Sequence, residues 1–158
     1  MLIYSAGAID LNEGTDTHEL VSKTAKHYRI GVNIFNPRGA FSLSAQGLHS
    51  KEDAKILVDI NKHALKSCHG VLFVIDKHTP SIGTPMELYF AHSQGIPKKV
   101  LYIKSNSNDP IPQYILAHID DISSDVIIAI AGIDSLNNAI KLTMDKLVQE
   151  IMNNNKGE

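Results

Sequence analysis

Short apolar runs alternate along the chain with segments whose apolar residues recur at helical spacing. Five runs have the length and composition of buried strands, namely 2–7, 31–35, 70–76, 98–104 and 125–132. The run GVLFVID at 70–76 is the clearest of the five. Strands that are buried on both faces read as continuous apolar runs, so the pattern predicts a parallel sheet at the core.

Helices are predicted between these strands. Apolar residues at helical spacing predict a helix over 17–29. The sequence SKED, which begins at Ser50, fits a helix cap with Asp53 at the third helical position, and it predicts a second, strong helix. The apolar stripe expected on that helix consists of Leu57, Ile60, Ala64, Leu65 and Cys68.

Strand and helix alternate five times. Further helices are predicted over 112–119 and 134–152, whereas 36–49 has no period and is predicted to be a loop. The alternation predicts an α/β protein, a single-domain Rossmann-like or flavodoxin-like sandwich with a five-stranded parallel sheet. We expect this domain to cover residues 1–152, with a disordered polar tail at 153–158.

Composition removes several classes of function. The formal net charge is −2, so we expect no binding to nucleic acid, and no apolar stretch approaches the roughly 20 residues of a membrane span. The eight histidines show no metal-ligand spacing, and neither GxGxxG nor GxxxxGK[ST] occurs, so no metal and no cofactor are expected. Cys68 is the single cysteine and the N-terminal residues do not resemble a signal peptide, which together favour the cytoplasm.

Glu87 is the residue with the greatest chemical interest. The sequence TPME fits a capping box with Thr84 as the N-cap, Pro85 as the first helical residue and Glu87 as the third. However, Glu87 also follows the probable central strand, and ligands of parallel sheets bind beyond the carboxyl ends of strands. Gly83 allows a ligand to approach the backbone and Ser81 can add a hydroxyl group, so capping and chemistry both stay open.

Cleavage at an anomeric carbon with retention needs a second carboxylate, about 5–5.5 Å from the first. Asp59 is one candidate, because it lies on the helix that leads into the central strand and away from the apolar stripe. By itself, Asp59 also reads as a solvated carboxylate paired with Lys55, Lys62 or His63. Asp76 is a rival at the end of the central strand, although aspartates commonly start loops there.

Three stretches of the chain carry a resemblance to a known family. They are IYSAGAI, LVDINKHALKSCHGVLFVID and PSIGTPMELYFAHSQGIPKKVLYI, which lie within about residues 2–104. These stretches resemble the nucleoside 2-deoxyribosyltransferase family, which includes 2'-deoxynucleoside 5'-monophosphate N-hydrolases. The third stretch is the most specific, since a glycine stands four residues before Glu87, an alanine four residues after it, and GIPKKVL follows.

The resemblance implies a role for each matching residue. Glu87 would be the nucleophile that attacks C1' of the deoxyribose, Asp59 would help to protonate the leaving base, and the hydroxyl group of Tyr4 would orient Glu87. The resemblance also implies a homodimer or larger homo-oligomer, with sites completed across subunits. The substrate would be a deoxynucleotide or a deoxynucleoside.

The family resemblance also helps to decide whether the protein hydrolyses the glycosidic bond or transfers the deoxyribose to a second base. Transferases of the family carry an aspartate six residues before the nucleophile, whereas Ser81 stands there in this chain and matches the hydrolases, in which that serine contacts the 5'-phosphate. Backbone N–H groups of the first loop, at Gly7, Ala8 and Ile9, could also bind phosphate. Asp10 departs from the hydrolase pattern, because a basic residue is expected at its position.

A cation elsewhere could compensate for Asp10. Arg38 is the first candidate, with Lys77 and His78 as others, although Arg38 also reads as an exposed loop charge. We therefore expect an N-glycosidase acting on monophosphates, ahead of a deoxyribosyltransferase. A nucleotide sensor without catalysis on the same scaffold, and a response-regulator-like or flavodoxin-like domain, are the alternatives from other classes.

Overall fold

The computed structural model describes residues 1–7, 16–37, 51–77 and 83–155. The strands among these residues are β1 (Leu2–Gly7), β2 (Asn33–Phe35), β3 (Gly70–Asp76), β4 (Lys98–Lys104) and β5 (Val126–Ile130). The helices among them are α1 (Thr17–Ala25), α3 (Lys51–Ser67), α4 (Gly83–Ser93), α5 (Gln113–Leu116), α6 (Ile122–Asp125) and α7 (Leu136–Asn154).

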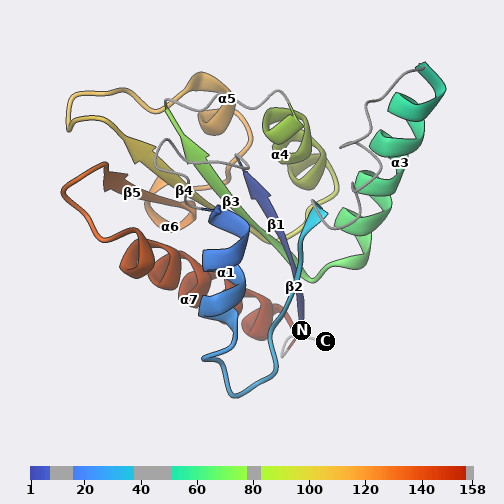
Figure 1. Ribbon diagram of the computed structural model, residues 1–158, viewed down its shortest axis with the longest axis horizontal. Helices are drawn as coiled ribbons and strands as arrows, with labels where there is room; N and C mark the ends of the chain where they lie inside the picture. Colours follow the sequence, from blue (N-terminus) through green and yellow to red (C-terminus); the bar gives the residue numbers. More distant parts are fainter. Residues whose placement is uncertain (8–15, 38–50, 78–82, 156–158) are drawn as a thin grey trace.

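The strands form one parallel sheet in the order β2-β1-β3-β4-β5 (Figure 1). The prediction of a five-stranded parallel α/β sheet is thus confirmed. The order reverses between β1 and β3, since the chain moves outward to β2 and then returns to the other side of β1. In sheets of this order the reversal leaves a crevice above the carboxyl ends of the two strands.

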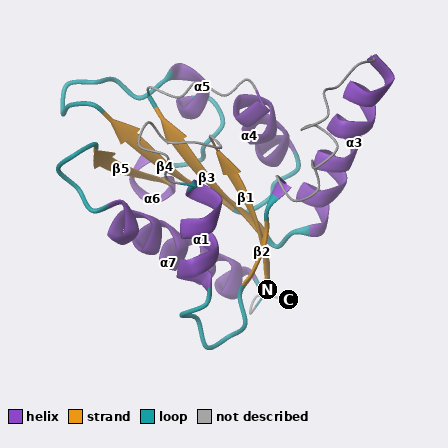
Figure 2. Ribbon diagram, viewed as in Figure 1, coloured by secondary structure: helices purple, strands orange, loops and turns teal. Residues whose placement is uncertain are grey.

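Helices cover both faces of the sheet (Figures 1 and 2). On one face, α1 and α7 pack against alternate strand residues such as Ile3, Leu72 and Leu101. On the other face, α3, α4 and α5 cover Tyr4 and Phe73 among others. Because side chains alternate between the two faces of the sheet, the side chain of Tyr4 lies on the face that α3 and α4 cover.

Several predicted boundaries shift. The first helix ends at Ala25 rather than at residue 29, and the second strand begins at Asn33, because Gly31 turns the chain with φ +68°. The short helix α6 was not predicted, and the final helix continues to Asn154, beyond the expected start of the polar tail. Residues 156–158 lie outside the described residues.

The apolar stripe predicted on the second helix is only partly correct. Leu65 and Cys68 are buried, but Ile60 is 39% exposed, and Ile56 and Val58 on the same helix are exposed as well. The reason is that only the last turns of α3 contact the sheet, while its first turns extend away from the other helices (Figure 1). The side chains of Asp53 and Leu57 lie outside the described residues.

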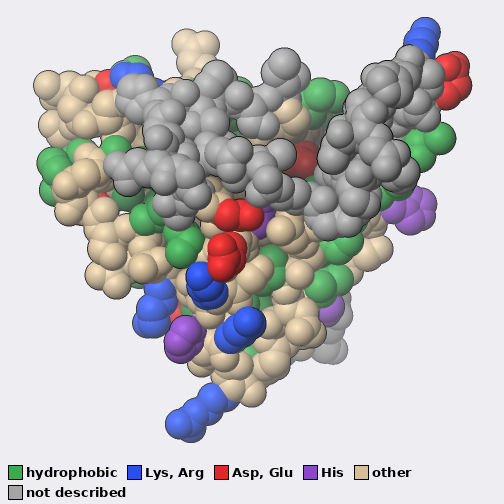
Figure 3. Space-filling model, viewed as in Figure 1, with side chains coloured by type: hydrophobic (Ala, Val, Ile, Leu, Met, Phe, Trp, Pro, Cys, Tyr) green, Lys and Arg blue, Asp and Glu red, His purple; other side chains and the backbone are tan. Residues whose placement is uncertain are grey.

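The surface agrees with the near-neutral composition. On the face shown in Figure 3, acidic and basic side chains are interspersed, and the residues drawn in colour form no broad basic area. None of the described helices is both long enough and apolar enough to cross a membrane. Within the described ranges, no three His, Cys, Asp or Glu side chains are grouped so that they could hold a metal ion.

Candidate active site

Glu87 and Tyr4 meet beside the point where the strand order reverses. Tyr4 belongs to β1, while Glu87 belongs to α4, the helix that follows β3, so neighbouring strands position the two side chains. The Tyr4 hydroxyl group donates a hydrogen bond to Glu87 Oε1 at 2.7 Å. Tyr4 is fully buried and its ring stacks on Phe35 of β2, with 5.4 Å between the ring centroids. The hydroxyl group is therefore held in place by the core of the protein.

A third polar side chain completes this cluster. Asn61 of α3 lies next to the same hydroxyl group, with 3.2 Å between Tyr4 Oη and Asn61 Oδ1. Three elements distant in sequence, β1, α3 and α4, thus converge on one tyrosine oxygen. We call Tyr4, Asn61 and Glu87 the Tyr4 cluster.

Burial changes the acidity of the cluster. Removal from water raises the pKa of Glu87 from its ordinary value of 4.5 to about 7, although the hydrogen bond from Tyr4 acts in the opposite direction. Burial, together with the nearby charge of Glu87, raises the pKa of Tyr4 above its usual range, so this hydroxyl group stays protonated. Glu87 can therefore exist in either protonation state near neutral pH, which suits a group that reacts.

A cavity of about 480 Å³ opens beside Glu87 between α3 and α4. Its described lining consists of Val58, Asn61, Lys62, Leu65, Gly83, Pro85, Met86, Glu87, Tyr89 and Phe90. Ligand sites are typically apolar clefts with a few convergent polar groups, and this lining has that character. Glu87 is the only carboxylate among these residues, and Lys62 is their only cation.

The local structure decides against the capping interpretation of Glu87. The helix begins at Gly83, which places Thr84 inside the first turn and Glu87 at the fifth helical position. A capping box needs its glutamate at the third position, so the predicted cap is wrong. The carboxylate of Glu87 instead accepts its hydrogen bond from Tyr4, and it is directed toward β1.

Asp59, the predicted second carboxylate, is not brought into this site. Its side chain is exposed and is absent from the described lining of the cavity, to which α3 contributes Val58, Asn61, Lys62 and Leu65. Helical residues advance by about 100° each, so Asp59 lies roughly 110° away from the middle of that face. The sequence expectation treated Asp59 and Glu87 as a pair, whereas the described geometry pairs Glu87 with Tyr4 and Asn61.

Asn61 was missed by the sequence reasoning, although a signal for it exists. Leu65 is 1% exposed and marks the side of α3 that faces the body of the protein. Counting back one turn from Leu65 gives Asn61, and two turns give Val58, both of which line the cavity. A polar residue one turn before this leucine was therefore a further candidate for the site.

The structure describes only some of the residues that the sequence predicted to bind substrate. Gly83 lines the cavity, and Gly7 ends β1. Gly7 has φ +153°, and a Cβ atom there would lie 2.3 Å from the Val74 carbonyl oxygen, so the close approach of β1 to β3 requires glycine. Ala8, Ile9, Ser81 and Arg38, and also Asp10 and His78, lie outside the described residues.

Lys77, which was one candidate for binding phosphate, has a partner within the protein. Its ammonium group forms an ion pair with Asp109, in the segment between β4 and α5. The hydrogen bond from Lys77 is the main cause that lowers the pKa of Asp109 to about 2. The charge of Lys77 is thus already compensated, and Arg38 stays the principal candidate for this role.

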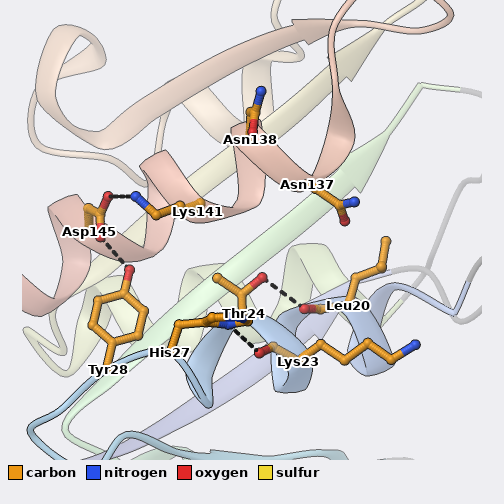
Figure 4. Close-up of a pocket in the computed structure, with 9 residues that line it drawn as sticks. All are labelled: Leu20, Lys23, Thr24, His27, Tyr28, Asn137, Asn138, Lys141 and Asp145. Carbon is orange, nitrogen blue, oxygen red and sulfur yellow. Dashed lines mark hydrogen bonds and ion pairs between the residues drawn. The ribbon is translucent and has the colours of Figure 1, made fainter.

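A second hollow, of about 660 Å³, lies between α1 and α7 on the opposite face of the sheet (Figure 4). Several of its polar groups are satisfied within the protein. The Tyr28 hydroxyl group donates to Asp145, Lys141 pairs with Asp145 at 3.5 Å, and the Thr24 hydroxyl group donates to the Leu20 carbonyl oxygen. This hollow is separated from Glu87 by the sheet.

The fold and the site together define a parallel α/β protein of flavodoxin-like strand order, with a half-buried carboxylate and a cavity beside the reversal of strand order. Among solved structures, the chain is similar to a 2-deoxyribosyltransferase from the psychrotolerant bacterium Bacillus psychrosaccharolyticus. The TM-score is 0.54 at 19% sequence identity, over 88% of this chain and 96% of the other, which shows a common fold. No protein-family model and no curated protein matches the sequence.

Proposed function

We propose that the protein cleaves the N-glycosidic bond of 2'-deoxynucleoside 5'-monophosphates, or of deoxynucleosides, through a covalent glycosyl–Glu87 intermediate. The observation that carries this proposal is the Tyr4–Glu87 hydrogen bond in the wall of a cavity beside the strand reversal. The similarity in fold to a 2-deoxyribosyltransferase supports the same class of chemistry. Moving deoxyribose to a second base is the alternative outcome of the same first step.

In the first step, a carboxylate oxygen of Glu87 forms a bond to C1' while the bond from C1' to the base nitrogen breaks. The bonding electrons leave with the base, which takes up a proton. Water, or the nitrogen of another base, then attacks C1' and releases the glutamate. Tyr4 supports this sequence, because a fixed hydroxyl donor keeps the reactive carboxylate at one position between the two steps.

The leaving base also needs a proton donor. By family resemblance it is Asp59, whose side chain is exposed on α3 in the free protein. Comparison of Asp59→Asn with Glu87→Gln tests this assignment directly. If both variants lose the release of free base, the result supports a mechanism with two acids. If only Glu87→Gln loses this activity, Asp59 has no part in the mechanism.

Release of free base, followed by chromatography, tests the main proposal. The protein is incubated with deoxynucleosides and with their 5'-monophosphates, each with and without a second free base. Release of base from monophosphates that does not depend on the second base supports hydrolysis. Appearance of a new nucleoside from an unphosphorylated donor supports the transferase. Full turnover by Glu87→Gln would contradict glycosidic cleavage through Glu87.

A non-catalytic nucleotide-binding protein is the second candidate. One observation favours it, namely that Glu87 is the only carboxylate among the described residues that line the cavity, whereas retaining cleavage uses two. Tight binding of a deoxynucleotide in calorimetry, with no base released over many hours, would support this function over the enzymatic one.

We also propose that the protein forms a homodimer or a larger homo-oligomer, as the family resemblance implies. The exposed apolar side chains of α3 and α4 support contact with a second copy of this chain, because such a contact would remove them from water. Those side chains are Ile56, Val58, Ile60, Met86 and Tyr89. A monomer in light scattering across the micromolar range would contradict the proposal.

A further inference from the structure

The Tyr4 hydroxyl group cannot serve both of its neighbours as a donor. A tyrosine hydroxyl group carries one hydrogen and can also accept hydrogen bonds. Its oxygen lies 2.7 Å from Glu87 Oε1 and 3.2 Å from the nearest atom of the Asn61 amide. The shorter distance is typical of a hydroxyl donor with a carboxylate acceptor, so the hydrogen belongs to the bond with Glu87.

The longer distance fits a different donor. Hydrogen bonds from a hydroxyl group span about 2.5–3.0 Å, whereas those from an amide N–H span about 2.7–3.2 Å. The two ends of an asparagine amide have the same shape, and a half-turn exchanges the oxygen and the nitrogen. With the nitrogen toward Tyr4, the 3.2 Å contact becomes a hydrogen bond from Asn61 to the tyrosine oxygen.

We propose that Asn61 is a positioning residue, which donates an amide hydrogen to the Tyr4 oxygen and thereby directs the Tyr4 hydrogen to ionised Glu87. Each bond in such a chain polarises the next, so the amide strengthens the hydrogen bond that Glu87 accepts. When Glu87 takes up a proton, it can donate to Tyr4, Tyr4 can donate to Asn61 Oδ1, and the amide turns over. The hydrogen-bond arrangement stands by itself, whereas its effect on turnover rests on the proposed function.

Among the residues that the structure describes, three other charged or titratable groups lie in the same cavity or bear on Tyr4, namely Lys62, Tyr89 and Cys68. Lys62 lines the same cavity from α3, and Tyr89 lines it from α4. Cys68, just after α3, is the other titratable group that bears on Tyr4, and burial raises its pKa to about 11, so it is neutral under ordinary conditions. Lys62 is unchanged when residue 61 is substituted, so it does not reproduce the effect that we assign to Asn61.

The test is a titration of the Glu87 carboxyl carbon by NMR, which needs neither substrate nor activity. The Glu87 signal is identified by its loss in Glu87→Gln. In Asn61→Leu, the amide can no longer donate to Tyr4, and we expect the midpoint of the Glu87 titration to rise by about 0.5 to 1 pH unit. A fall in the midpoint would mean that Asn61 competes with Glu87 for the Tyr4 hydrogen, and it would overturn the proposal, as would an unchanged midpoint.

Two further variants keep the test specific. In a Tyr4→Phe background, Asn61→Leu should no longer move the midpoint, because the hydroxyl group that transmits the effect is absent. A shift of the same size in that background would refute action through Tyr4. Val58→Ile is the matched control, since it changes an apolar residue on the same helix and in the same cavity. If it moves the midpoint as far as Asn61→Leu does, general packing rather than hydrogen bonding is responsible.

The amide group of Asn61 gives an independent measurement on the unmodified protein. Its NH₂ signals should shift with pH and show the same midpoint as Glu87, since the amide turns over with the proton. Signals that stay constant while Glu87 titrates would contradict the proposal. If the protein releases no base but the Glu87 carboxyl and Asn61 amide signals titrate together, the proposed function is rejected and the role of Asn61 is retained.

Discussion

Ionised Glu87 should reduce the stability of the folded protein, and Glu87→Gln should restore it at alkaline pH. The pKa of Glu87 is raised from 4.5 to about 7, mainly by burial. A carboxyl group with a raised pKa stabilises the fold at pH values below 4.5, and this contribution is lost as the pH rises through about 7. Glutamine has nearly the same shape and cannot ionise.

The size of the effect follows from that pKa. A difference of about 2.5 pH units, at about 1.4 kcal/mol each, corresponds to about 3 kcal/mol. Glu87 borders the cavity and is only partly enclosed by protein, so we expect about 2 kcal/mol after allowance for solvent. Glu87→Gln should therefore be more stable than the unmodified protein by about 2 kcal/mol at pH 8.5, and by almost nothing at pH 4.

Urea denaturation of both proteins at each pH, followed by circular dichroism, measures this difference. Glu19→Gln on α1 is the control, because Glu19 is exposed and its ion pair with Lys23 lies at the surface, so the substitution should change the free energy of unfolding by less than about 0.5 kcal/mol. An equal gain in the free energy of unfolding of Glu87→Gln at both pH values would show that the shape of the side chain, rather than its charge, is responsible. A loss of stability at pH 8.5 would refute the reasoning.

Other predictions follow from the same geometry. Tyr4→Phe removes the hydrogen bond that lowers the pKa of Glu87, so the acid limb of the pH–rate profile should move to higher pH, and kcat should fall by about 10- to 100-fold. For the unmodified protein, the proposed function predicts that kcat/KM for base release rises with pH up to about 7 and then levels off, and a profile that is flat between pH 5 and pH 8 would contradict a role for ionised Glu87. If Asp59 protonates the leaving base as proposed, Asp59→Asn should lower kcat by about 100-fold or more in steady-state kinetics, and a change of less than about twofold would remove Asp59 from the mechanism. Gly7→Ala should destabilise the fold by about 2 kcal/mol or more in urea denaturation, because the new methyl group meets the Val74 carbonyl oxygen, and an unchanged midpoint would refute that close approach.

The fold was predictable because each central strand has a continuous apolar run in its middle, such as VLFVI in β3 and VLYI in β4. The strands predicted at 70–76 and 98–104 match β3 and β4 at both ends. Alternation of strands with helices then implies a parallel sheet. The order of the strands was not predictable from this pattern, since Rossmann-like and flavodoxin-like orders use the same alternation of elements.

The site was predictable only in part, and the reason lies in how α3 packs. Glu87 follows from its place after the central strand and Tyr4 follows from the family resemblance, and a hydrogen bond joins the two side chains. The apolar pattern of α3 was misleading, because Ile60 is exposed and the buried side is defined by Leu65 instead. Asp59 was selected by the family resemblance and by its place off the expected stripe, and the same expected stripe gave no reason to consider Asn61.

The difference between Asp59 and Asn61 matters for the electrostatics of Glu87. A second carboxylate at position 61 would place two negative groups on one hydroxyl donor, and at least one of them would be protonated near neutral pH. A neutral amide avoids that repulsion, so Glu87 can lose its proton at about pH 7 rather than at a higher value. Asn61→Asp should therefore raise the midpoint of the Glu87 titration further than Asn61→Leu does. An equal or smaller rise in the carboxyl NMR titration would show that charge at position 61 does not reach Glu87.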